Sequence, residues 1–161
     1  MKAVLAVDPG LTSGICFVTW SGEQGQDPVI EMSVEANEED YVAHLRDYLQ
    51  EWESYESFNV ACERFTINAQ TVRNSQAPYS LEQIGILKQT CRDHGFAVDD
   101  IVFQAPVDAK NMFPNKALKT LGLWHVGGAG HALDSLRHAA LLLVRKYKWI
   151  PRALLEDTQN N

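Results

Sequence analysis

Cysteine is scarce in this chain, and its three cysteines lie far apart, at Cys16, Cys62 and Cys91. They form no C-x-x-C pair, which is the spacing typical of zinc or redox sites, and their odd number does not suit a disulfide framework. The residues around them are apolar or helical in pattern. We therefore predict three reduced thiols that are mostly buried.

Long hydrophobic runs are also missing. No stretch approaches the roughly 18 consecutive apolar residues of a membrane-spanning helix, and the short apolar segment near the N-terminus is unlike a secretory signal. We expect a soluble, cytoplasmic protein with no membrane partner. The 161 residues, 45% of them hydrophobic, suffice for one compact core. We expect a single domain over residues 1–150, followed by a polar, disordered tail over residues 151–161.

Positive charge is in short supply, because 14 Lys and Arg residues face 21 Asp and Glu residues and the formal net charge is −7. Such a balance argues against binding to nucleic acid, since phosphates favour a basic surface. The charge is uneven: residues 1–60 hold 2 basic and 12 acidic residues (net −10), whereas residues 61–161 hold 12 and 9 (net +3). The second part can present a basic face to a polyanion, although ordinary solvated surfaces account for the same charges.

The hydrophobic pattern predicts the order of strands and helices. Segments rich in β-branched and aromatic residues predict strands at residues 2–8, 14–20, 28–35, 58–63 and 100–104. Apolar residues at three- and four-residue steps predict helices at residues 38–54, at 80–94, from about Pro114 to Gly122, and at 131–148. This order predicts an α/β protein. We expect a mixed five-stranded sheet, with three antiparallel strands followed by two parallel ones, flanked by helices.

Acidic residues stand at the ends of two predicted strands. Asp8 closes the first strand in AVDPGLTSG, and Glu63 closes the fourth in FNVACE. If these strands are parallel neighbours, the two carboxylates lie roughly 5 Å apart, where they repel each other unless a proton or a cation lies between them. His131 and Asp134, at i and i+3, share one face near the start of the last helix.

Each of these residues also has a structural interpretation. Asp8 precedes Pro-Gly, which is good turn chemistry, Glu63 can pair with the adjacent Arg64, and His131 and Asp134 can cap the last helix. As a set, three carboxylates and an imidazole suit Mg²⁺ or Mn²⁺. Two such ions about 3.5–4 Å apart activate a water molecule and stabilise the leaving oxygen in phosphodiester cleavage.

The motifs AVDPGLTSG, ACERF and HALDSLRHA resemble those of the RuvC-like Holliday junction resolvases of the RNase H-like superfamily, particularly the short forms found in phages. The resemblance extends from Met1 to about Lys148. It implies an RNase H-like sheet and a metal-dependent endonuclease that cleaves branched DNA, such as Holliday junctions, in a bacterial or phage-infected cell.

The resemblance also implies that Asp8, Glu63 and Asp134 are catalytic metal ligands and that two Mg²⁺ or Mn²⁺ ions are the cofactors. The fourth ligand position is an acid in some members and a histidine in others, and here it is His131. A neutral imidazole binds Mg²⁺ less readily than Mn²⁺. His138 lies on nearly the same helical face, and we expect it to support the site from behind or to pack in the core.

The family's DNA-binding surface implies phosphate contacts from the densest basic cluster, which is Lys110, Lys116 and Lys119. The segment after the fourth strand is expected to enter the junction and to stack an aromatic ring on an unpaired base; its candidate residues are Arg64, Phe65, Arg73 and Tyr79. For Phe65, core packing is an alternative. A two-fold homodimer would suit a four-way junction, with the helix at residues 80–94 as one possible interface.

Two other functions stay open on the sequence alone. The D-x-G-x-T-x-G turn also resembles the phosphate-binding turn of actin-like ATPases and sugar kinases, although these need a duplicated fold for which 161 residues leave little room. The second alternative is an RNase H-like module that binds branched nucleic acid without cutting it. The intact set of ligands argues against this second alternative, whereas the acidic composition and the histidine at position 131 keep it open.

Overall fold

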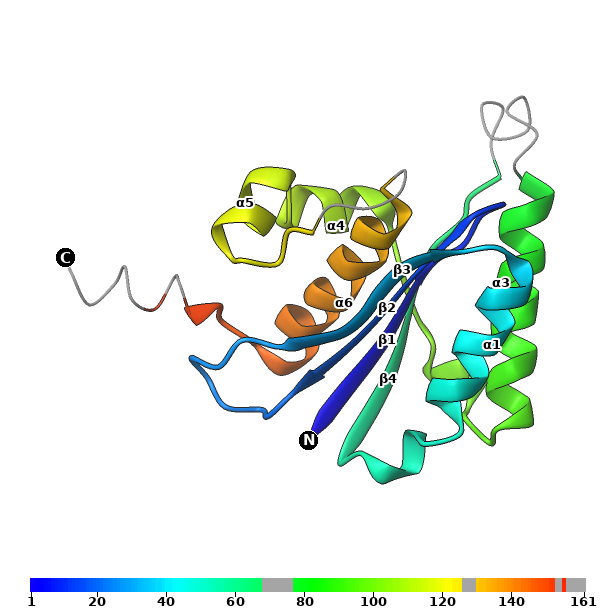
Figure 1. Ribbon diagram of the computed structural model, residues 1–161, viewed down its shortest axis with the longest axis horizontal. Helices are drawn as coiled ribbons and strands as arrows, with labels where there is room; N and C mark the ends of the chain where they lie inside the picture. The colour runs from blue at the N-terminus through cyan, green and yellow to red at the C-terminus, as the bar shows by residue number, and fades with distance from the viewer. Residues whose placement is uncertain (68–76, 126–129, 153–154, 156–161) are drawn as a thin grey trace.

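A five-stranded mixed sheet forms the centre of the molecule (Figure 1). The computed structural model describes residues 1–67, 77–125, 130–152 and 155. The strands lie in the order β3-β2-β1-β4-β5, with antiparallel pairing among β1, β2 and β3 and parallel pairing from β1 through β4 to β5. Their bounds are Lys2–Asp8 (β1), Ser13–Trp20 (β2), Val29–Ala36 (β3), Ser57–Glu63 (β4) and Val102–Gln104 (β5). This sheet confirms the predicted fold class.

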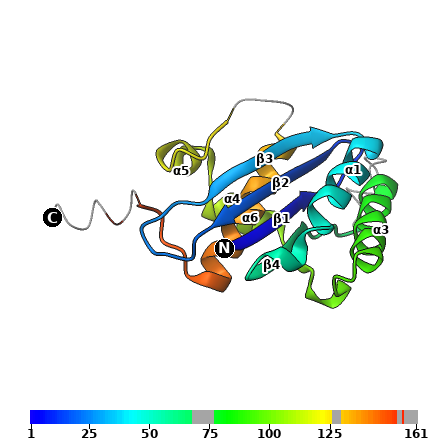
Figure 2. The ribbon, with the colours of Figure 1, turned by 60° about the horizontal axis from the view of Figure 1, so that its bottom comes forward.

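Helices cover both faces of the sheet (Figures 1 and 2). Helices α1 and α3 pack against each other on one face, while α6 crosses the other face and contacts α4. The bounds are Glu38–Leu49 (α1), Ala77–Asp93 (α3), Pro106–Met112 (α4), Asn115–Thr120 (α5) and His131–Tyr147 (α6). Across the described ranges, no helix is both long and apolar enough to cross a bilayer.

The alternation of side chains along the central strands decides which residues face α6. Ala6 and Ala61 belong to the core beneath α6, whereas Val7 belongs to the core beneath α1 and α3. Both faces of these strands are covered, which explains their nearly continuous apolar sequences. Asp8 and Glu63 follow two residues after Ala6 and Ala61, so the same alternation directs both carboxylates to the α6 face.

The helix predicted over residues 38–54 is shorter than expected. It ends at Leu49, and a separate 3₁₀ turn, η1, covers Trp52–Ser54. This turn brings the Trp52 indole back to the end of α3, where Nε1 donates a hydrogen bond to the His94 carbonyl at 2.9 Å. The tertiary contact of one aromatic side chain therefore replaces the last turn of the predicted helix.

Two other predicted boundaries also differ. The helix predicted from about Pro114 to Gly122 is present as α5, but the residues before it form a further helix, α4, which the prediction missed. The strand predicted over residues 100–104 is shorter than expected and covers only Val102–Gln104, because Val98–Asp100 form a 3₁₀ turn, η2, before it. Most of the predicted tail, residues 151–161, lies outside the described residues.

The three cysteines are free and buried, as predicted. Burial raises the pKa of Cys16 and of Cys91 to about 12, so almost no reactive thiolate exists at pH 8. We expect the folded protein to show no thiol reactive toward DTNB at pH 8, and all three to react in guanidinium chloride. A thiol that reacts in the native protein as fast as free cysteine would contradict this packing.

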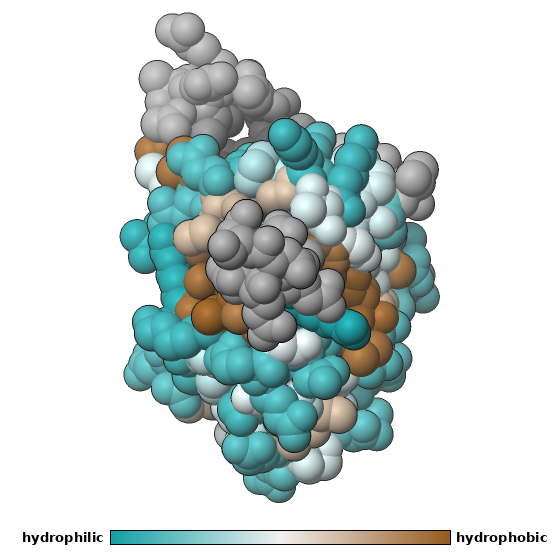
Figure 3. Space-filling model, turned by 90° about the vertical axis from the view of Figure 1, so that its left-hand side faces the viewer, coloured by the Kyte–Doolittle hydropathy of each residue, from teal (hydrophilic) through white to brown (hydrophobic). Residues whose placement is uncertain are grey.

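Apolar residues gather on the side of the molecule shown in Figure 3. A groove of about 470 Å³ lies there between α4, α5 and the segment after α6, and its lining includes Phe113, Leu121, Trp149 and Ile150. The groove adjoins the C-terminal end of α6. The acidic ends of the strands lie at the opposite, N-terminal end of this helix, so the groove is separate from them.

Candidate active site

Residues near one end of the five strands form a row across the sheet, and most of them are polar. Asp8 pairs in register with Gly14 of β2, and Gly14 pairs with Glu35 of β3. On the other side of Asp8, parallel β4 ends in Glu63, which pairs with Gln104 of β5. The expected meeting of Asp8 and Glu63 at one end of the sheet is therefore present, and two further polar residues extend the row.

Gly14 allows α6 to begin directly on this row. A Cβ atom placed on Gly14 would lie 1.9 Å from the backbone oxygen of His131 and 3.0 Å from the backbone nitrogen of Ala132. Only a residue without a side chain permits this approach of strand and helix. Gly14 lies within β2, so it serves a close contact between elements and not only the turn that the motif suggested.

Asp8 and His131 form a direct pair at the centre of the row. Asp8 is 6% exposed, and His131 Nδ1–H donates a hydrogen bond to Asp8 Oδ2 at 2.9 Å. Burial raises the pKa of Asp8, and the negative charges of Glu63 and Asp134 add to this rise against the opposing effect of His131. The hydrogen bond to Asp8 in turn raises the pKa of His131. A buried carboxylate close to two others is an environment that favours a cation.

His138 contacts Glu63 and fixes the orientation of its carboxylate, as expected from the sequence. His138 is 1% exposed, and its Nε2–H donates to Glu63 Oε2 at 3.0 Å. Its Nδ1 lies 2.8 Å from Oε1 of Gln104, the last residue of β5. His138 thereby joins the ends of β4 and β5. The pair leaves the second carboxylate oxygen of Glu63 available for a ligand.

Asp134 is held by two basic side chains. Lys110 Nζ lies 3.0 Å from Asp134 Oδ2, and the guanidinium of Arg137 donates to Oδ1. Burial lowers the pKa of Lys110, but the hydrogen bond and charge of Asp134 outweigh it and the pKa is raised overall. Arg137 also donates to the carbonyl of Phe113 at 2.9 Å and to Asn115 Oδ1. Arg137 thereby ties the α4–α5 segment to the site.

Glu35 is a site residue that the sequence analysis missed. Its Oε1 accepts hydrogen bonds from the backbone N–H groups of Gly130 (2.8 Å) and His131 (2.9 Å). Gly130 has no side chain to cap α6, so a carboxylate from β3 satisfies these first N–H groups instead. In the sequence, the only indication of this role is that Glu35 stands near the end of the third predicted strand. Its contact with the start of α6 becomes visible only from the strand register.

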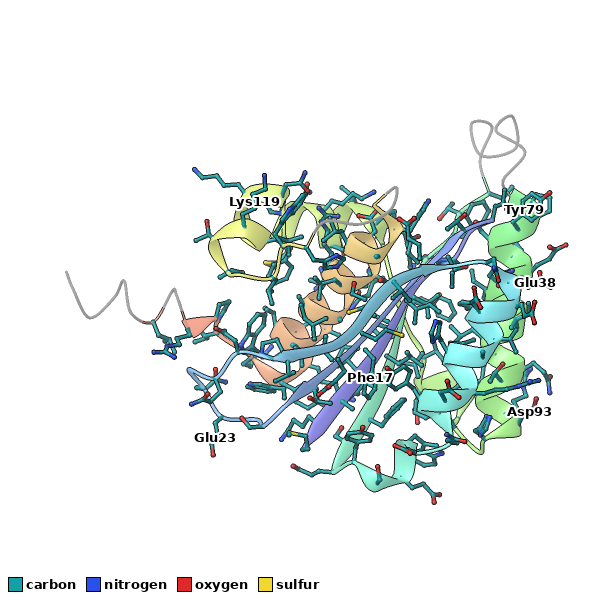
Figure 4. All side chains as sticks on the ribbon, in the orientation of Figure 1. Phe17, Glu23, Glu38, Tyr79, Asp93 and Lys119 are labelled. Carbon is teal, nitrogen blue, oxygen red and sulfur yellow. The ribbon has the colours of Figure 1, made fainter. Side chains whose placement is uncertain are left out.

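The predicted DNA-contacting residues separate into several places. Lys110 lies at the carboxylates, whereas Lys119 on α5 lies over the Trp124 ring, 4.7 Å from its centre. Lys119 and Tyr79 lie on opposite sides of the sheet (Figure 4). Lys116 is exposed on α5 and lines the apolar groove. Arg64 is exposed and Phe65 is half-buried, whereas Arg73 lies outside the described residues. The structure therefore brings one of the three lysines to the carboxylates.

The donor set suits a divalent cation such as Mg²⁺ or Mn²⁺. It offers carboxylate oxygens from Asp8, Glu63 and Asp134 and an imidazole from His131. In the part of the chain that the structure describes, no three His, Cys, Asp or Glu side chains converge closely enough to hold one ion. Asp134 contacts Lys110 and Arg137 instead.

The strand order and the helices on both faces define an RNase H-like fold. The fold is similar to that of RuvC from Thermus thermophilus: one structure of that protein has a TM-score of 0.60 at 17% identity, covering 87% of this chain and 94% of the other. A structure of T. thermophilus RuvC in complex with Holliday junction substrate has a TM-score of 0.56 at 18% identity, covering 88% and 92%. No protein-family model and no curated protein matches the chain. The resemblance seen in the motifs is confirmed at the level of the fold.

Proposed function

We propose that the protein is a metal-dependent, structure-selective endonuclease that cleaves branched DNA such as Holliday junctions. The observation that carries the proposal is the buried Asp8 carboxylate, which lies beside Glu63 at the sheet end and whose pKa is raised by burial and by the charges of Glu63 and Asp134. The likeness in fold to RuvC, one structure of which is a complex with Holliday junction substrate, supports the choice of substrate.

Asp8, Glu63, His131 and Asp134 would hold the divalent ions. When bound, two such ions supply an activated water molecule, stabilise the leaving oxygen and reverse the local negative charge, so that a phosphate can approach three carboxylates. Around them, the contacts to His138 and Glu35 fix the direction of Glu63 and the start of α6. Lys110, once it leaves Asp134, is placed to contact a phosphate of the bound strand. A two-fold homodimer would place two such sites for paired cuts in a four-way junction.

A second function has one observation in its favour. In this structure each carboxylate already has a partner from the chain itself: His131 for Asp8, His138 for Glu63, and the two basic side chains for Asp134. Such internal pairing gives each carboxylate a hydrogen-bonding partner without a metal ion. A module that binds branched DNA without cutting it would have this property, and the cleavage experiment decides between the two.

The experiment compares strand cleavage of four-way junctions, flaps and linear duplexes of matched sequence, each with Mg²⁺, with Mn²⁺ and with EDTA. We expect symmetric nicks in the junction, little cleavage of linear duplex and none in EDTA. Junction binding in EDTA with no cleavage in either metal would support the non-cutting module. Equal cleavage of junction and linear duplex would contradict structure selectivity.

The choice of metal provides a further prediction. Because imidazole is a poorer ligand for Mg²⁺ than for Mn²⁺, we expect faster junction cleavage in Mn²⁺ than in Mg²⁺. The substitution His131→Asp replaces the nitrogen donor with oxygen and should narrow this difference by about tenfold, if the single ligand accounts for about 1.4 kcal/mol of the discrimination. Single-turnover rates over a series of concentrations of each metal measure the effect. An unchanged ratio of the two rates in the variant would show that His131 is not a ligand.

A further inference from the structure

A second cavity lies beside Asp134, on the side of α6 that faces α4 and α5. Its volume is about 470 Å³, and the described residues that line it include Lys110, Asn115, Trp124, Leu133, Asp134 and Arg137. The cavity thus combines an aromatic ring, an apolar wall and polar groups, and it shares Asp134 with the candidate active site. A cavity of this size has room for one nucleobase together with part of its sugar.

The amide of Asn115 is held in a defined orientation at this cavity. Arg137 is 7% exposed and donates to Asn115 Oδ1, to the carbonyl of Phe113 and to Asp134. Because its oxygen accepts from the guanidinium, Asn115 retains the Nδ2 hydrogens as donors. An amide whose orientation is fixed by a buried charge presents its donors in one direction, so it can distinguish bases by where their acceptors and donors lie along the edge.

The other walls suit the rest of a nucleotide. Trp124 lines the cavity, and Lys119 lies over the ring and adds positive charge next to it. Indole rings stack on any base through its π-face. Lys110, whose side chain is 55% exposed, connects the cavity to Asp134 and can bind the phosphate that joins a base here to its neighbour at the carboxylates.

We propose that this cavity receives one unpaired base of the branched DNA, next to the phosphate that is cleaved, with Trp124 as the stacking platform and Asn115 as the residue that selects the base by the position of the acceptors on its edge. This inference rests on the proposed function and adds a specificity-determining residue to it. Branched DNA favours such a mode, since a base at a crossover loses less stacking and pairing when it leaves the helix.

The test measures binding in EDTA, so that it is independent of cleavage. Four-way junctions carry an abasic site or each of the four bases at successive positions around the crossover, and the apparent Kd is measured for each. We expect one position at which an abasic site raises the apparent Kd by about tenfold. At the same position the four bases should give different apparent Kd values. Trp124→Ala should remove most of the abasic effect, and Trp124→Phe should keep part of it.

Asn115→Asp is the decisive substitution. The aspartate still accepts from Arg137 but loses the Nδ2 donors, so the preference among bases at that position should disappear or reverse. Asn111→Asp is the matched control, because Asn111 is exposed on neighbouring α4 and the substitution adds the same negative charge. The base preference of this variant should equal that of the original protein. Thermal unfolding shows that each variant is folded.

The outcomes separate this inference from the proposed function. Base preference at one position that is lost in Asn115→Asp supports the cavity assignment even if no metal gives cleavage, in which case the nuclease function alone fails. Cleavage of junctions with no base-dependent position, or with equal effects of Asn115→Asp and Asn111→Asp, overturns the cavity assignment alone. Absence of any binding to branched DNA overturns both.

Discussion

Replacing Asp8 with asparagine is expected to lower the rate of junction cleavage by about a thousandfold, equivalent to about 4 kcal/mol of transition-state stabilisation. Asparagine keeps the size of the side chain and can still accept the hydrogen bond from His131 Nδ1, but it loses the negative charge that a divalent ion needs. The charge that is lost lies in a buried environment close to Glu63 and Asp134, where burial already raises the pKa of Asp8. We therefore expect no decrease in Tm, and loss of activity with a stable fold.

The measurement is single-turnover cleavage of a four-way junction in Mn²⁺, together with junction binding in EDTA. Binding in EDTA should stay within a few-fold of the original protein, since the substitution leaves the basic residues in place. Asp99→Asn is the matched control, because Asp99 is exposed on η2 and has no contact with the site; it should cleave normally. Full activity in Asp8→Asn would exclude this carboxylate from the chemistry, and with it the proposed site.

Replacing Gly14 with alanine is expected to lower stability more than any exposed substitution. The new Cβ would lie 1.9 Å from the backbone oxygen of His131, and backbone atoms cannot give way as a flexible side chain can. Either α6 moves from the sheet or the strand bends. Overpacking of this kind costs about 3 kcal/mol, which corresponds to a decrease in Tm of about 6–12 °C for a chain of this size.

The same displacement would separate His131 from Asp8, so cleavage should fall together with Tm. Gly85→Ala is the control from the same protein. Gly85 is exposed within α3, and a Cβ there meets no atom within 4 Å. Since glycine in a helix costs about 0.5–1 kcal/mol relative to alanine, this variant should have a slightly higher Tm and unchanged activity. An unchanged Tm in Gly14→Ala would mean that α6 does not begin where the structure places it.

Part of the candidate site could be predicted from the sequence. The positions of Asp8 and Glu63 at the ends of apolar strands predicted that the two carboxylates meet, and the parallel pairing of β1 with β4 brings them together. The spacing of His131 and Asp134 predicted a shared helix face, and His131 does contact Asp8. These predictions succeeded because the hydrophobic periodicity that places each residue at the end of its strand, or on one face of its helix, is set by neighbouring residues.

Other features of the site could not be predicted in this way. Glu35 reaches the start of α6 from a strand about 95 residues earlier in the chain, and the pairing of Asp134 with Lys110 and Arg137 depends on how α4 and α5 pack on α6. Helix α4, which packs on α6, was missed for the same reason. Each of these contacts joins residues whose distance is decided by packing, and packing leaves no periodic signal in the sequence.

By itself, the sequence determined the α/β class, the order of the strands and the presence of three carboxylates and an imidazole on elements that can converge. Only the tertiary structure decided how closely α6 approaches the sheet at Gly14, which partners hold each carboxylate, and where a cavity remains beside Asp134. The physical reason is that strand register and helix packing are properties of contacts between distant segments, whereas hydrophobic periodicity is a property of one segment alone.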